Sequence, residues 1–217
     1  MLKDSVYGDS FTPYYKGIFL NYRNNKMYKK TLSLLFVLLV GLNVGSVFAQ
    51  GGGGGGGFRL PPLLMESDAF EDGGIVPDKY TFRGGNTQPG FKFSNAPEGT
   101  VSYAIILHDI DVALMGGTDD VLHWVAWNIP AEAGGIPEGS LPEGSVTGTN
   151  LMRQTSFMGP GAPAGPRYHH YVFELYALNA NLDLPNTAGR KELLEAMAGK
   201  VVAKSAYVGR FRSAPAQ

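Results

Sequence analysis

Residues 101–111 read VSYAIILHDID, an apolar run of strand length that ends in two aspartates. The run from Val101 to His108 shows no alternation with polar residues, which predicts a strand buried on both faces. Two more runs of this kind follow, LHWVAWNI at 122–129 and YVFELYAL at 171–178. Their Trp, Val, Tyr and Phe content also favours strands. Three such strands predict a sheet at the centre of the domain, with Trp124, Trp127 and Phe173 in its core.

The segments around these three strands predict weaker elements separated by turns. Residues 190–200 place Leu193, Leu194 and Met197 on one face, which predicts a helix that ends near Gly199. Strands therefore dominate, without the strand–helix alternation of a doubly wound fold. We expect one mostly β, mostly antiparallel domain with one or two peripheral helices. Short strands are expected at 79–83, 91–93 and 201–208.

Composition excludes several classes of protein. The 217 residues include 18 Lys plus Arg against 19 Asp plus Glu, a net charge of −1, so a basic nucleic-acid surface is not expected. Cysteine is absent, which excludes a disulfide scaffold, a thiolate nucleophile, a Cys-ligated zinc and a lipid anchor on an N-terminal Cys. The 30 Gly and 14 Pro fit a turn-rich β architecture.

Residues 27–49 have the layout of a secretory signal peptide. Two lysines precede the apolar stretch 32–40, and Val47 and Ala49 are the small residues at −3 and −1 of a cleavage point. We therefore expect export to the periplasm or the medium, with cleavage after Ala49. The apolar stretch is short for a membrane span, so no stable span is expected after cleavage. An uncleaved N-terminal anchor is the alternative.

The signal layout also divides the chain. Residues 1–26 would be an upstream start that is not native, ahead of a true start at Met27, or a disordered extension. Seven glycines from Gly51 indicate a flexible linker, so residues 50–68 are assigned to a linker and N-terminal arm. The folded domain is expected at 69–212 and a disordered tail at 213–217.

Polar residues gather where the three long strands begin or end. Asp109 and Asp111 follow the first strand, His123 lies in the second, and His169 and His170 open the third. Adjacent strand residues face opposite ways, so only one of His169 and His170 is expected at a given pocket. These residue types could form an anion pocket. Structural roles are the alternative, since an Asp-x-Asp sequence often forms a turn and the histidine beside Trp124 can be structural. A zinc or iron site is another alternative.

The segment GPGAPAGP, residues 159–166, precedes the two adjacent histidines. Prolines lack a donor and glycines permit positive φ, so this segment can be neither a helix nor a central strand. Its glycines could aim free backbone N–H groups at one point, an arrangement that binds anions. A plain connector is the alternative.

In their order, these pieces resemble the phosphatidylethanolamine-binding protein family, also called the Raf kinase inhibitor protein-like family. The resemblance is carried by SYAIILHDIDVA (102–113), VLHWVAWNIPA (121–131) and GPGAPAGPRYHHYVFELYALN (159–179), and it covers about 69–209. The family's Asp-Pro-Asp-Ala-Pro lacks both prolines here, with Ile110 and Ala113 in their places. Ala162 replaces one proline of a Pro-Pro pair, and His170 replaces an arginine.

The resemblance implies a large central antiparallel sheet, a smaller second sheet, Greek-key connections and peripheral helices. It implies a ligand that is a small anion or a phospholipid headgroup, such as phosphoethanolamine. It implies neither cofactor nor metal, and it makes a homodimer and a regulatory or inhibitory role plausible. The implied anion-binding residues are Asp109, His123, Gly161, Pro163, His169 and Tyr171, with Asp111, Gly159 and Trp124 in support.

Asp109 could act in two ways in such a pocket. It could accept a hydrogen bond from an imidazole, which would raise the pKa of that histidine and fix its tautomer. It could instead pair with the ammonium of a phosphoethanolamine group. We favour the first role and expect both His123 and His169 to gain charge as the pH falls.

Three functions follow from this reading. The leading hypothesis is a non-catalytic module that binds a small anion. An enzyme that uses Asp109 and the histidines as acid and base lacks a nucleophile, because Cys is absent and Ser156 has no nucleophile-elbow context. A protein-interaction or inhibitor role in the cell envelope is the third.

Overall fold

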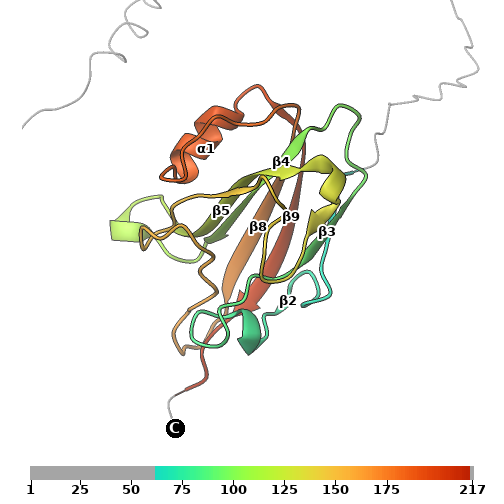
Figure 1. Ribbon diagram of the computed structural model, residues 1–217. Coiled ribbons are helices and arrows are strands. Elements are labelled where there is room, and N and C mark those ends of the chain that lie inside the picture. Colours follow the sequence, from blue (N-terminus) through green and yellow to red (C-terminus); the bar gives the residue numbers. More distant parts are fainter. Residues whose placement is uncertain (1–61, 216–217) are drawn as a thin grey trace, which may run out of the picture. The chain divides into compact units, whose positions relative to one another are not determined.

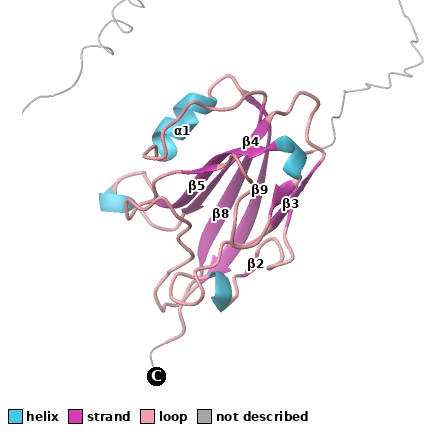
Figure 2. Cartoon of the chain, in the orientation of Figure 1, coloured by secondary structure: helices cyan, strands magenta, loops and turns pink. Residues whose placement is uncertain are grey.

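A computed structural model describes residues 62–215 of the chain (Figure 1). The predicted signal peptide, the residues upstream of it and the glycine run lie outside the described residues. Within 62–215, no helix combines the length and apolar character needed to cross a membrane. Strands dominate the domain, as the secondary-structure colouring of Figure 2 shows.

The larger sheet has six strands in the order β2-β9-β8-β4-β5-β7. All pairs are antiparallel except β2 with β9. All eight residues of the central strand β4 are buried, which confirms the prediction for this segment. The chain passes from β5 to β7 at one edge and returns to β8 on the other side of β4, a Greek-key path. The strands are β2 (Gly74–Ile75), β4 (Ser102–Asp109), β5 (Val121–Pro130), β7 (Val146–Thr147), β8 (His169–Leu178) and β9 (Val201–Phe211).

A smaller sheet of three strands lies against one face of the larger one. It consists of β1 (Leu64–Glu66), β3 (Phe91–Ser94) and β6 (Gly135–Ile136), in the order β1-β3-β6. Aromatic rings fill the space between the sheets: Phe91 packs on Phe173 with ring centroids 4.9 Å apart. The mostly β prediction with two sheets is therefore confirmed. Strand β1 lies inside the segment that the sequence assigns to the N-terminal arm.

The opposite face of the larger sheet is covered by α1 (Arg190–Met197). Leu193 and Met197, four residues apart on the helix, pack in a second core with Ile106 and Trp127. Leu194, which we expected on the same face, is instead 41% exposed. Leu194 lies at the margin of the apolar stripe, about 100° around the helix from Leu193, and it faces solvent there.

The strand predicted at 79–83 is wrong. The chain there forms the 3-10 helix η2 (Asp78–Tyr80), preceded by Pro77 and followed by turns. The Thr81 hydroxyl donates a hydrogen bond to the Asp78 carbonyl at 2.9 Å, which closes the segment locally. A Cβ at Gly84 would lie 1.9 Å from that carbonyl oxygen, so only glycine fits this turn. The other short helices are η3 (Leu114–Gly116) and η4 (Ala131–Ala133).

Candidate functional site

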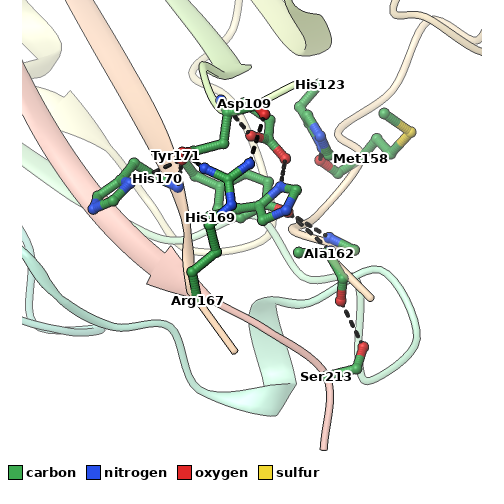
Figure 3. Close-up of polar contacts among 11 residues, drawn as sticks. Asp109, His123, Met158, Ala162, Arg167, His169, His170, Tyr171 and Ser213 are labelled. Atoms are coloured by element: carbon green, nitrogen blue, oxygen red, sulfur yellow. Dashed lines mark hydrogen bonds and ion pairs between the residues drawn. The ribbon is translucent and has the colours of Figure 1, made fainter. Parts of the chain in front are cut away.

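Asp109 is the last residue of β4, and its carboxylate is buried at 3% exposure. It pairs with Tyr171 on β8, two residues after His169, so the three side chains lie on one face of the sheet. Asp109 Oδ2 accepts a hydrogen bond from His169 Nδ1 at 2.8 Å (Figure 3). Asp109 Oδ1 accepts one from the Asp111 backbone N–H at 3.0 Å. Both carboxylate oxygens are thus engaged within the protein, which favours the imidazole-orienting role.

A β-bulge places His123 beside this pair. Leu107 pairs with Trp124 and His108 pairs with Leu122, so His123 is an extra residue on β5. Strict alternation would point His123 away from the face on which Trp124 lies, but a bulge re-aims the side chain. The His123 ring stands edge-on to Tyr171, with centroids 5.1 Å apart. His123 is 5% exposed, and Trp124 is core, packed on Phe157.

The protonation of His123 differs from our expectation. Its Nδ1–H donates to the Met158 carbonyl at 2.9 Å, which leaves Nε2 as an acceptor in the neutral ring. Burial lowers the pKa of His123, and the Met158 carbonyl and the charge of Asp109 offset this only in part. Asp109 does act to raise the pKa of His123, as we expected, but the net direction is the opposite of the expected one. Burial outweighs the nearby carboxylate.

Three amides of the glycine-rich loop, those of residues 159, 161 and 162, are hydrogen-bonded within the protein, whereas we predicted free N–H groups at its glycines. The N–H groups of Gly161 and Ala162 donate to the Tyr171 hydroxyl at 3.2 and 2.9 Å. The N–H of Gly159 donates to Asn86 Oδ1 at 2.8 Å, and Pro163 is exposed. The amides of Gly161 and Ala162 thus position Tyr171 and are not free for an anion. The sequence could not show this, because it depends on the path of the loop past β8.

Tyr171 is fully buried, and burial, followed by the charge of Asp109, raises the pKa of its hydroxyl. The hydroxyl therefore stays protonated across the neutral range. Ser213 holds the same loop from the C-terminal side, since its N–H and hydroxyl both donate to the Ala162 carbonyl, at 3.0 and 2.7 Å. Ser213, the first residue of the expected tail, thus contacts the loop.

Asp111 and His170 form a separate pair. His170 Nδ1 donates to Asp111 Oδ2 at 2.8 Å, and Arg167 Nη1 donates to Asp111 Oδ1 at 2.7 Å. Burial raises the pKa of Asp111, but hydrogen bonds from His170 and the charges of His170 and Arg167 outweigh it and lower the pKa overall. The two adjacent histidines have different carboxylate partners, as their opposite orientations require. Sequence reasoning missed Arg167, which no motif marks.

Three cavities of the described domain lie away from these residues. They have volumes of about 410, 810 and 350 Å³ and are lined by other residues than Asp109, His123, His169 and Tyr171. The four residues therefore form a polar cluster at the end of the sheet, which we call the Asp109 cluster. In the described part of the chain, no three His, Asp or Glu side chains are grouped so that they could hold a metal ion.

Comparison with known proteins identifies relatives across the whole domain. The model of the phosphatidylethanolamine-binding protein family matches residues 66–212. A UPF0098 protein of Methanothermobacter thermautotrophicus is 37% identical over 153 residues, which cover 68% of this chain and 97% of that protein. A Mycobacterium tuberculosis protein named as a candidate lipoprotein, LppC, is 31% identical over 150 residues, 69% of this chain and 72% of that protein.

Solved structures give the same fold. YbcL of E. coli, described as a member of the mammalian PEBP family, aligns with a TM-score of 0.65 and 26% identity. CT736 of Chlamydia trachomatis, described as a candidate PEBP homologue, aligns with the same TM-score and identity. Each alignment covers 70% of this chain and 99% of the other.

Proposed function

This chain belongs to the phosphatidylethanolamine-binding protein family, and we propose that its Asp109 cluster binds a small anionic group without catalysing a reaction. The ligand class is phosphate-bearing, with a free phosphoester or a phospholipid headgroup as its two possible sources. Family membership is the premise, and the contacts of His169 carry the proposal.

The observation that carries it is the orientation of His169. Asp109 accepts the Nδ1–H of the ring, and Nε2 has no hydrogen-bond partner among the described residues. The side chain is 14% exposed, and Nε2 is not among the buried atoms without a partner. When the ring is protonated, Nε2–H becomes a charged donor held in one direction. Charged donors form hydrogen bonds about twice as strong as neutral ones.

Two other features favour an anion over a cation. Asp109 directs both oxygens at protein donors, so its charge compensates the imidazolium and is not presented to a ligand. Two arginines without an ion pair among the described residues lie near His169: Arg212 binds the Gly165 carbonyl of the preceding loop, and Arg210 lies opposite His170 on β9. Their positive potential would raise the local concentration of anions.

Catalysis receives no comparable support. An Asp–His pair can act as a general base, but it needs a nucleophile or a positioned water to activate. Within residues 62–215, no Ser or Thr hydroxyl is hydrogen-bonded to His123 or His169. The Tyr171 hydroxyl accepts two amide hydrogens and has a raised pKa, which makes it a poor nucleophile.

We also propose that the protein acts outside the cytoplasm. The signal-peptide layout of residues 27–49 supports export, and so does the name of the mycobacterial relative. Mass spectrometry of protein from the envelope or medium should find an N-terminus at Gln50. Recovery of mature protein that still carries residues 1–49 would reject cleavage.

Sulfate is the clean probe for the binding proposal, because it stays fully ionised between pH 6 and pH 8. Calorimetry should show that sulfate affinity rises as the pH falls from about 8 to about 6. His169→Ala should lower the affinity at pH 6 by about tenfold, ~1.4 kcal/mol. His170→Ala is the matched control, since its ring pairs with Asp111, and should change the affinity less than about twofold.

Two results would overturn this proposal. One is a sulfate affinity that does not depend on pH, and the other is an equal loss in His169→Ala and His170→Ala. The source of the phosphate is tested by comparing free phosphoethanolamine with vesicles that contain phosphatidylethanolamine. Binding to the free compound alone would assign the site to soluble phosphoesters.

A further inference from the structure

A cavity of about 810 Å³ opens at the first turn of α1. Its walls come from the loop between β4 and β5, from residues 149–151 and from α1 itself, all on the same face of the larger sheet (Figures 1 and 2). This volume is about twice that of either other cavity described above. It falls within the range of about 300–1,000 Å³ that is typical of small-molecule sites.

One wall of this cavity is apolar and open to solvent. Four leucines line it, and two of them, Leu151 and Leu194, are 47% and 41% exposed. Their neighbours in sequence, Met115 beside Leu114 and Met152 beside Leu151, are also largely exposed. Exposed apolar side chains from three segments thus gather around one hollow, a pattern that marks ligand sites. The four leucines are Leu114, Leu122, Leu151 and Leu194.

The cavity also has a polar part, which hydrogen bonds hold in place. Arg190 Nη1 donates to Asp120 Oδ1 at 2.5 Å, and His108 Nδ1 donates to Asp120 Oδ2 at 2.6 Å. His108 is only 8% exposed, so it anchors Asp120 to the sheet below. The charges of Arg190 and Asp120 compensate each other, while the buried Nε of Arg190 has no hydrogen-bond partner among the described residues.

Three other charged side chains line the cavity, namely Asp119, Lys191 and Glu195. All three are exposed, and none of them forms an ion pair within residues 62–215. Two carboxylates therefore oppose one ammonium, which gives the open part of the cavity a net charge of −1. A cation is favoured there over an anion.

We propose that this cavity binds an amphipathic small molecule that carries a primary ammonium group. The apolar part of the ligand packs on the leucine wall, and the ammonium lies at Asp119 and Glu195. This second site lies apart from the Asp109 cluster, shares no residue with it and does not depend on the anion-binding proposal.

Three probes with one skeleton test the preferred charge: phenylbutylamine, phenylbutanol and phenylbutyrate. Titrations followed by NMR should rank the amine first, the alcohol second and the carboxylate last. The double variant Asp119→Asn, Glu195→Gln should weaken amine binding about fivefold, the range expected for exposed ion pairs. It should leave alcohol binding unchanged. Glu98→Gln, an exposed carboxylate elsewhere, is the control.

Leu194→Trp tests the location, because the larger ring fills the cavity from an exposed position. It should weaken the binding of all three probes at least tenfold. Leu64→Trp is the matched control, because Leu64 is 40% exposed on β1 and does not line the cavity. His169→Ala should leave amine binding unchanged, which separates this proposal from the first.

Three results would overturn it: no amine binding by the wild-type protein, carboxylate binding as tight as amine binding, or full affinity in Leu194→Trp. The double charge variant keeps the test valid if Leu194→Trp does not fold, because both of its positions are exposed polar sites.

Discussion

Two adjacent residues of β4, His108 and Asp109, each form an Asp–His pair, but on opposite faces of the sheet. On the inner face, Asp109 holds His169 at 2.8 Å and leaves its Nε2 without a partner at the edge of the sheet. On the outer face, Asp120 holds His108 at 2.6 Å, and His108 Nε2 is buried without a hydrogen bond, 3.8 Å from Glu174 Oε2. The same two residue types thus give one accessible nitrogen and one sealed nitrogen. Both histidines are held by an aspartate, so the Asp–His pair alone does not indicate a binding role. What distinguishes the two sites is whether Nε2 of the histidine is accessible.

The largest effect in this comparison should come from the outer pair. His108→Ala removes a buried ring and one of the two partners of Asp120 that hold the β4–β5 loop to the sheet. We expect the free energy of unfolding to fall by about 2–4 kcal/mol, from the lost packing and the weakened charge pair. Urea denaturation measures this.

His170→Ala is the control for that change, because its ring is 46% exposed and its pair with Asp111 lies near the surface. It should cost less than about 1 kcal/mol. Sulfate affinity should be unchanged in His108→Ala. The proposed difference between the two faces would be wrong if His108→Ala had the same free energy of unfolding as the wild-type protein. It would also be wrong if His108→Ala lost sulfate binding.

The next prediction compares sulfate binding after removal of the charge of Asp109 or of Asp120. Asp109→Asn removes the charge that compensates a protonated His169, so sulfate affinity at pH 6 should fall about fivefold, ~1 kcal/mol. Asp120→Asn should leave sulfate affinity unchanged, because its partners are His108 and Arg190. Calorimetry on both variants makes the comparison. Tighter sulfate binding by Asp109→Asn would instead mean that this carboxylate acts on the anion mainly by repulsion.

The inner and outer faces differ in how far the sequence could predict them. Unbroken apolar runs predicted β4, β5 and β8, because such runs are stable only as buried strands. Period-2 alternation predicted that only one of His169 and His170 would face a given pocket, and the two rings do bind different carboxylates. Alternation failed at His123, where a bulge inserts one residue into β5. The family resemblance marked the inner residues, whereas it assigned no role to His108, Asp120 or Arg190, so the outer network escaped prediction.

The loop at 159–166 shows a second limit. Its glycines and prolines correctly indicated an irregular segment, but not where its amides point. Gly161 and Ala162 donate to Tyr171, and the partner of His123 is the backbone carbonyl of Met158. Backbone groups carry no residue signature, so neither contact could be read from side-chain types.

The smallest effect concerns His123, which shares the inner face with His169 but is held neutral by burial. Its pKa is lowered in the folded state, so the unfolded chain binds more protons in the window just below the ordinary histidine value. The stability contribution is therefore fully present above that value and is lost as the pH falls through it. His123→Asn removes the titrating group and keeps a side-chain N–H for the Met158 carbonyl. Unfolding free energies at pH 7.5 and pH 5 should therefore differ less in His123→Asn than in the wild-type protein, with His170→Asn as the control. Parallel pH dependence in His123→Asn and wild type would show that burial does not hold His123 neutral in the folded protein.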